Sequence, residues 1–101
     1  MIEITYGSRE PPSLAICGHA GYSTYGTDIV CSAVSALYQT LVGSIAEFTG
    51  DDISARVEPG DSELIWNGNI SDTGRVILNS FLLGLQDVAE QYPEYVSFQI
   101  V

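Results

Sequence analysis

The spacing of apolar residues divides the chain into strand-like and helix-like segments. Apolar and polar residues alternate in Ile2-Glu3-Ile4-Thr5-Tyr6, and this period of two is typical of a half-buried strand. Five segments fit a strand: 2–6, 13–18, 53–57, 64–66 and 96–100. Pro59-Gly60-Asp61 joins the third to the fourth, and its turn residues predict a β-hairpin there.

Two further segments have the spacing of a helix. In the first, at about 100° per residue, the apolar positions form one stripe. The stripe consists of Ile29, Val30, Ala33, Val34, Leu37, Tyr38, Leu41, Ile45 and Phe48. Thr27 or Asp28 is the predicted N-cap of this helix, and Gly50 is expected to close it just after Phe48.

The second helix has its apolar residues at Ile77, Phe81, Leu85, Val88 and Tyr92. Ser71, Asp72 or Thr73 can cap its start, and Pro93 stops it. The predicted order of elements is therefore ββαββαβ. We expect an α+β fold, a two-layer sandwich with two helices packed on one sheet.

Length and charge narrow the class of protein. With 101 residues, the chain is expected to form a single domain over 1–101, because domains typically hold about 100 to 150 residues. Arg9, Arg56 and Arg75 oppose 13 acidic residues, which gives a formal net charge of −10. That charge repels phosphate backbones and anionic membranes, so we expect neither nucleic acid nor a membrane as partner. A basic protein would be attracted, although acidity also serves solubility.

The sequence also bears on compartment and cofactors. Residues 1–6 lack the basic region and apolar run of a signal peptide, and no segment is expected to reach the roughly 20 apolar residues of a membrane span. The two cysteines are expected to be reduced, while a disulfide between Cys17 and Cys31 stays open. One histidine and two cysteines fall short of four zinc ligands, so no metal or cofactor is predicted.

The stretch Gly18 to Leu37 contains the residues best suited to chemistry. It holds the single histidine, His19, and twelve residues later Cys31. In the predicted helix Cys31 lies in the first turn, where the macrodipole and free N–H groups favour a thiolate and where its own N–H is a candidate oxyanion donor. Cys31 also falls at the edge of the apolar stripe, beside Ser35, which favours a reactive thiol over a core residue.

A structural interpretation of these residues stays open. Free cysteine is among the most buried residue types, and a single histidine is commonly a hydrogen-bonded structural residue. Cys17 is predicted to fill a half-buried sheet, and strand alternation would put it on the same face as His19. Asp28 is the nearest acid to this pair and can either orient His19 or cap the helix.

Gly18-His19-Ala20-Gly21, a short loop and then Asp28-Ile29-Val30-Cys31-Ser32-Ala33-Val34-Ser35-Ala36-Leu37 closely resemble the signature of the ribosomal-processing cysteine proteases, the Prp family. The resemblance implies that Cys31 is the nucleophile and His19 the base. Ser32 stands where family members usually have alanine, which neither removes a reacting group nor adds bulk. Asp28, Ser35 or a backbone carbonyl is then the candidate for orienting His19.

The resemblance also implies a substrate and a setting. Family members remove a short N-terminal extension from a large-subunit ribosomal protein, cutting after an apolar segment that ends in Phe and precedes a basic stretch. They form homodimers, and a cytoplasmic location is implied. The loop residues expected to close over the peptide are Ala20, Gly21, Tyr22, Ser23, Thr24, Tyr25, Gly26 and Thr27.

Three alternatives remain at this point. A phage-type relative would process capsid protein instead of a ribosomal protein. A non-catalytic α+β module that binds a basic ribosomal or other protein partner would explain charge and size without chemistry, but not the edge position of Cys31. Another thiol enzyme, such as a thioesterase or a thiol peroxidase, would use the same nucleophile.

Overall fold

The computed structural model describes residues 1–19 and 25–101, apart from the side chains of residues 25–28. Seven elements follow one another: β1 (Ile2–Gly7), β2 (Ser13–Cys17), α1 (Tyr25–Phe48), β3 (Ile53–Glu58), β4 (Asp61–Trp66), α2 (Asp72–Gln91) and β5 (Val96–Ile100). The predicted order ββαββαβ is confirmed. The hairpin across Pro59 and Gly60 is present, with Asp61 already in its second strand.

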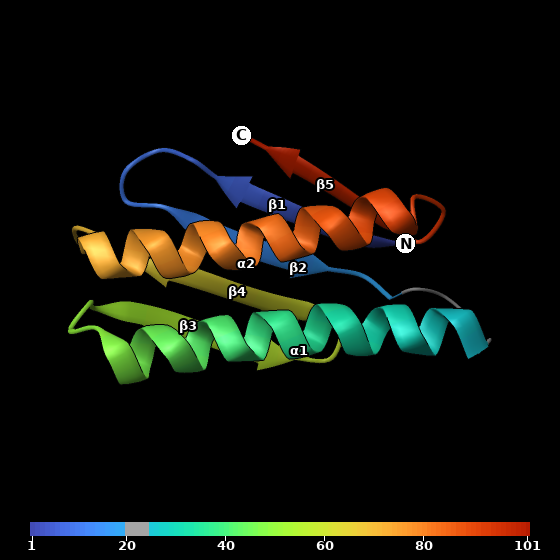
Figure 1. Cartoon of the computed structure of the whole chain (residues 1–101), viewed down its shortest axis with the longest axis horizontal. Coiled ribbons are helices and arrows are strands. Elements are labelled where there is room, and N and C mark those ends of the chain that lie inside the picture. Colours follow the sequence, from blue (N-terminus) through green and yellow to red (C-terminus); the bar gives the residue numbers. More distant parts are fainter. Residues whose placement is uncertain (20–24) are drawn as a thin grey trace.

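The strands form one mixed sheet in the order β3-β4-β2-β1-β5. Neighbours are antiparallel except β1 and β5, which are parallel because the chain crosses over through α2 before it returns. Both helices lie side by side on one face of this sheet (Figure 1). The predicted two-layer α+β sandwich is therefore confirmed.

Strand alternation decides what each sheet face carries. Ile4 of β1, Leu14 of β2 and Leu64 of β4 are fully buried beneath the helices. Their neighbours in sequence, such as Thr5, Ala15 and Glu63, point to the uncovered face. The hydrophobic core thus lies between the sheet and the two helices, while the other sheet face is mainly polar.

The helix α1 begins earlier than the sequence suggests. Its first residue is Tyr25, so the prediction of an N-cap at Thr27 or Asp28 is wrong. Capping preference is a local signal, and no proline near Gly26 prevents one further turn. The predicted end at Phe48 is confirmed.

The buried stripe of α1 is narrower than predicted. Its buried members are Val30, Val34, Tyr38, Leu41 and Ile45. The two ends of the predicted stripe, Ile29 and Phe48, are 46% and 69% exposed, so only the middle of the stripe packs into the core.

Residues Ile29–Phe48 are long and apolar enough to cross a membrane by length and composition alone. The expectation that no segment reaches this limit is therefore wrong. Small and hydroxyl residues such as Ser32, Ala36 and Gly43 take exposed positions of this helix where charged residues would be more usual, so the mean hydropathy stays high although these residues are not part of the core. A core helix packed on a sheet passes the same test.

The second helix is capped by Ser71, whose hydroxyl accepts a 3.0 Å hydrogen bond from the Gly74 N–H, so the first of the three predicted caps is confirmed. The buried residues of α2 are Gly74, Leu78, Leu82 and Leu85. The other predicted stripe residues, Ile77, Phe81, Val88 and Tyr92, are partly buried against the same core. α2 packs against both α1 and β5, and Leu78 and Leu85 are its fully buried side chains.

A carboxylate joins three elements at the end of the sheet opposite the β3–β4 turn. Asp51 accepts hydrogen bonds from the indole N–H of Trp66 (3.1 Å) and from the N–H and hydroxyl of Ser71 (3.2 and 3.1 Å). Burial, the largest single influence, raises the pKa of Asp51, but these hydrogen bonds together outweigh it and lower the pKa below 3.8. Asp51 thus ties the loop after α1 to β4 and to the start of α2.

Asp51→Ala should lower the free energy of unfolding by about 1 to 3 kcal/mol, since it leaves the donors of Trp66 and Ser71 without their acceptor. Urea unfolding at pH 7 measures this loss. The matched control is Asp52→Ala, which removes one exposed bond from Asn67 and should cost at most about 0.5 kcal/mol. Equal losses in both variants would contradict a structural role for Asp51.

The lowered pKa of Asp51 predicts that the stability of the fold depends on pH. A carboxylate whose folded pKa lies below its unfolded value stabilises the fold above the unfolded pKa, and this contribution is lost as the pH falls through the folded pKa. Below about pH 4, stability should therefore fall more steeply in the unchanged protein than in Asp51→Asn, which cannot titrate. Parallel curves would contradict the assignment.

Candidate active site

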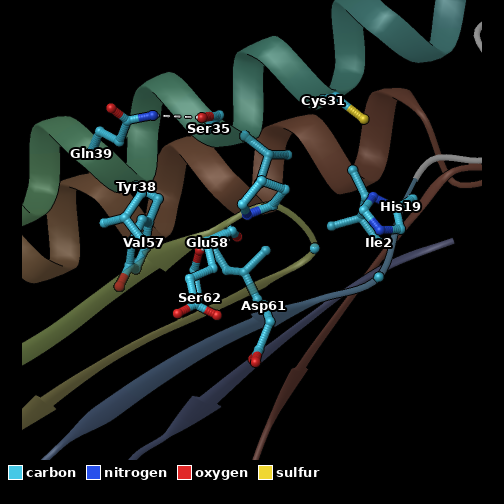
Figure 2. Close-up of a pocket in the computed structure, with 15 residues that line it drawn as sticks. Ile2, His19, Cys31, Ser35, Tyr38, Gln39, Val57, Glu58, Asp61 and Ser62 are labelled. Atoms are coloured by element: carbon cyan, nitrogen blue, oxygen red, sulfur yellow. Dashed lines mark hydrogen bonds between the residues drawn. The ribbon is translucent and has the colours of Figure 1, made fainter.

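A pocket of about 380 Å³ lies between the N-terminal half of α1, the end of β2 and the β3–β4 turn. Its apolar lining consists of Ile2, Ile16, Val34, Tyr38 and Val57, and its polar lining of His19, Cys31, Ser35, Gln39, Glu58, Asp61 and Ser62. Figure 2 shows Cys31 reaching in from α1 and His19 from the end of β2, at the same end of the pocket. The structure therefore brings together the two residues that the sequence singled out.

Cys31 is a partly exposed free thiol at the edge of the buried stripe of α1, as predicted. It is the seventh residue of α1, so the prediction that it lies in the first turn is wrong. Helix-dipole effects fall off within the first turn, and the Cys31 N–H has an intrahelical carbonyl partner at this position. The helix start therefore supplies neither the expected thiolate stabilisation nor a free Cys31 N–H for an oxyanion.

His19 reaches the pocket because the chain turns at Gly18. Gly18 has a φ of +94°, a conformation that favours glycine, and it breaks the alternation of β2. Cys17, the residue before it, is exposed, points to the uncovered sheet face and does not line the pocket. The prediction that Cys17 and His19 share one face is therefore wrong, and the two free cysteines lie on opposite sides of the sheet.

The imidazole of His19 packs directly on Gly60 of the β3–β4 turn. A Cβ placed on Gly60 would lie 2.5 Å from both Cε1 and Nε2 of the ring. Gly60 has a φ of +73°, and its carbonyl accepts a 2.9 Å hydrogen bond from the Gly18 N–H. The turn thus fixes the backbone before His19 and also forms the floor under its ring.

Two further polar side chains of α1, Ser35 and Gln39, line the pocket. Gln39 donates a 2.7 Å hydrogen bond to the Ser35 hydroxyl, one helical turn away. This bond engages Ser35 with its own helix, and a role of Ser35 in orienting His19 stays a prediction. The side chain of Asp28 and the loop residues Ala20 to Thr24 lie outside the described residues.

The backbone of the remaining loop residues, Tyr25, Gly26 and Thr27, belongs to α1. The prediction that all eight residues from Ala20 to Thr27 form a loop is therefore wrong for these three. Nothing in their sequence breaks a helix, since a single glycine only weakens one.

Tyr38 forms part of the pocket wall and connects α1 to the sheet. Its buried ring lies under the helix, and its hydroxyl donates a 2.8 Å hydrogen bond to the Arg56 carbonyl of β3. Burial raises the pKa of Tyr38, with Glu63 adding to this and Arg56 opposing it. The hydroxyl therefore stays protonated and remains a donor at neutral pH.

The residues that the sequence did not single out come mainly from the β3–β4 turn. Glu58, Gly60 and Asp61 line the pocket, and Asp61 also forms a 2.8 Å ion pair with Arg56. The turn itself was recognisable from Pro59 and Gly60. The turn lies beside His19 because β2 pairs with β4, which sets Cys17 opposite Asp61. This pairing joins segments far apart in the sequence, so no local pattern predicts it.

Within 1–19 and 29–101, no group of three or more His, Cys, Asp or Glu side chains is arranged to hold a metal ion. The reactive groups that line the pocket include the Cys31 thiol and the His19 imidazole.

Comparison with known proteins decides the family. A family model described as cysteine protease Prp matches residues 1–97. The chain belongs to this family. The ribosomal processing cysteine protease Prp of Staphylococcus aureus is 32% identical over 81 residues, which cover 78% of this chain and 76% of the relative. The family recognised in the sequence and the enzyme class, a cysteine protease, are confirmed.

Solved structures extend the likeness to the whole Prp fold. A crystal structure of a Streptococcus mutans protein has a TM-score of 0.85 at 32% identity and covers 100% of this chain and 94% of that one. The essential ribosomal processing protease Prp of S. aureus, crystallised with a substrate peptide, has a TM-score of 0.89 at 24% identity and covers both chains fully. At that identity the second likeness supports the fold alone.

Proposed function

We propose that this Prp-family chain removes a short N-terminal extension from a large-subunit ribosomal protein, with Cys31 as nucleophile and His19 as its base. The observation that carries this proposal is that the only histidine of the chain lines the same pocket as Cys31, while Cys17 does not. The family supplies the reaction class, since its members are cysteine proteases for ribosomal processing. The S. aureus relative crystallised with a substrate peptide supports a peptide substrate.

In the proposed reaction the Cys31 sulfur attacks the scissile carbonyl, and His19 takes the thiol proton. The tetrahedral intermediate then collapses, His19 gives this proton to the leaving amine, and the N-terminal fragment stays on Cys31 as a thioester. His19 next removes a proton from water, hydroxide attacks the thioester, and the protonated histidine returns the proton to the thiolate. The cycle consumes one water and one peptide bond.

The pocket wall supports an apolar side chain next to the cut. Ile16, Val34 and Val57 line the same pocket as Cys31, and Glu58 and Asp61 line it from the β3–β4 turn. An apolar segment before the cut and a basic stretch after it would match these two kinds of surface. The proposal is tested by incubating the purified protein with the ribosomal-protein precursor and sequencing the new N-terminus of the product. Cleavage of a capsid precursor with the ribosomal precursor left intact would favour the phage-type alternative.

The charge balance gives a second test of the substrate. Exposed charges are screened over about 8 Å at physiological salt, so a basic flank should mainly speed association. Raising salt should therefore lower cleavage efficiency modestly for a peptide with lysines after the cut. It should have almost no effect on the same peptide with serines there, and equal salt dependence would contradict capture by the acidic surface.

Thiol labelling tests the assignment of Cys31 without a substrate. Cys17 is exposed and Cys31 only partly exposed, so accessibility alone favours faster alkylation of Cys17. We expect iodoacetamide at neutral pH to modify Cys31 faster, because His19 can accept its proton. Mass spectrometry measures both rates of alkylation. His19→Ala should slow the alkylation of Cys31 and leave that of Cys17 unchanged. Faster labelling of Cys17 in the unchanged protein would contradict the assignment.

We also propose a homodimer in the cytoplasm. Val76 and Leu83 of α2 are exposed apolar residues that a second copy could cover. Two free cysteines suit a reducing compartment. Light scattering at micromolar concentration measures the mass in solution, and the mass of a monomer would contradict the proposed homodimer.

A further inference from the structure

We infer that the substrate binds as an added β-strand along the free edge of β3, in a groove that leads to Cys31. This inference rests on the proposed function and concerns how the peptide is held. Within residues 1–19 and 25–101, β3 is an outer strand of the sheet and pairs only with β4 (Figure 1). An unpaired edge offers a row of backbone donors and acceptors to an extended peptide.

The ladder between β3 and β4 determines which backbone groups are free. The Asn67 N–H donates to the Asp52 carbonyl at 2.8 Å, which makes this a hydrogen-bonded pair at the start of the ladder. In an antiparallel ladder such pairs alternate, so Ser54, Arg56 and Glu58 direct their backbone groups towards β4. The N–H and C=O groups of Ala55 and Val57 therefore point to the open edge.

This edge continues into the pocket. Val57 and Glu58 line the pocket together with Cys31. Val57 is 51% exposed although it lies on the sheet face that carries the helices, so α1 leaves this part of β3 open. Gln39 and Ser35 of α1 also line the pocket, and together with Cys31 they line a second, shallow hollow on α1.

An extended peptide fits this geometry better than a helix or a folded domain. Successive side chains of a strand alternate, so every second one would face Val34, Tyr38 and Val57, and the others would face solvent. The hydrogen bond from Tyr38 to the Arg56 carbonyl holds β3 at a fixed distance from α1. The opposite outer strand, β5, contributes no residue to this pocket in the described part of the chain.

Backbone-modified peptides test the inference without changing the protein. The probe is an extended peptide with an apolar segment ending in Phe followed by lysines, bound to Cys31→Ala so that it is not cleaved. We expect N-methylation at alternate residues to weaken binding about tenfold for each lost hydrogen bond, and methylation at the residues between to have little effect. Uniform sensitivity, or none, would overturn the added strand.

A protein variant tests which edge is used. Val57→Pro removes the outward N–H and should raise KM about tenfold or more with kcat little changed, whereas Val57→Ala keeps the N–H and should have a smaller effect. Ile100→Pro on β5 is the matched control. The Val101 N–H donates to the Tyr6 carbonyl of β1 at 2.9 Å, so the N–H of the preceding residue, Ile100, points away from β1 to the other open edge of the sheet. The rate of Cys31 alkylation should be the same in all three.

The outcomes separate this inference from the function on which it rests. If the unchanged protein cleaves the peptide and Val57→Pro behaves like Ile100→Pro, docking on β3 is overturned and the proposed protease stands. If the unchanged protein neither binds nor cleaves any peptide, both are overturned. Deuterium exchange adds a measurement on the unchanged fold: peptide binding to Cys31→Ala should protect the amides of Ala55 and Val57 and leave those of β5 unaffected.

Discussion

Cys31→Ser and His19→Ala should each lower kcat/KM for cleavage by about 10³-fold or more, because each removes one half of the nucleophile and base pair. Both residues lie at the pocket surface and neither belongs to the buried core. The fold should therefore survive, and circular dichroism and urea unfolding should match the unchanged protein. Combining the two changes should cost little more than either alone, since residues that act as a unit are not additive.

Cys17→Ser is the matched control for this pair. It changes the same chemical group on the uncovered face of the sheet, away from the pocket. Its cleavage rate should equal that of the unchanged protein. Full activity in Cys31→Ser, or loss of activity in Cys17→Ser, would contradict the assignment of the nucleophile.

Gly60→Ala should lower kcat/KM on the order of 10²-fold, because displacing a reacting group by about 1 Å can have that effect. The added Cβ would come within 2.5 Å of the His19 ring, so the imidazole must move from its present position in the pocket. The φ of +73° adds strain of about 1 to 2 kcal/mol, which unfolding would report. Alkylation of Cys31 should slow towards the rate found in His19→Ala.

Two comparisons separate displacement of His19 from simple destabilisation. Gly68→Ala adds a methyl group into open space in another loop and should leave both activity and stability nearly unchanged. In a double-mutant cycle, Gly60→Ala should destabilise the protein less when His19 is already alanine, because only the φ strain remains. Additive effects on stability would mean that the ring does not rest on Gly60.

The fold could be predicted from the sequence because its signals are local. The alternation at Ile2 to Tyr6 and the stripe of α1 indicate which side of each element is buried. Ser71 caps the start of the second helix with its hydroxyl, and Pro93 prevents the helix from continuing. The start of α1 could not be predicted in this way. Thr27 and Asp28 are good caps in isolation, but the helix continues to Tyr25.

The site could be predicted only in part. His19 and Cys31 stand out as reactive residue types close in sequence, and they line one pocket. Gly60 lies forty-one residues after His19 in sequence and reaches it only because β2 pairs with β4, which depends on the packing of the whole sheet. The positive φ of Gly18 likewise overturned an alternation argument that treated β2 as straight to its end.

In the proposed reaction, Cys31 carries the acyl group during peptide cleavage. Rapid acid quenching during turnover, followed by digestion and mass spectrometry, measures where that group is attached. We predict a thioester of the N-terminal substrate fragment on the peptide that contains Cys31, absent from Cys31→Ser. An adduct on Cys17 or on any other residue, formed at the rate of turnover, would contradict Cys31 as the nucleophile.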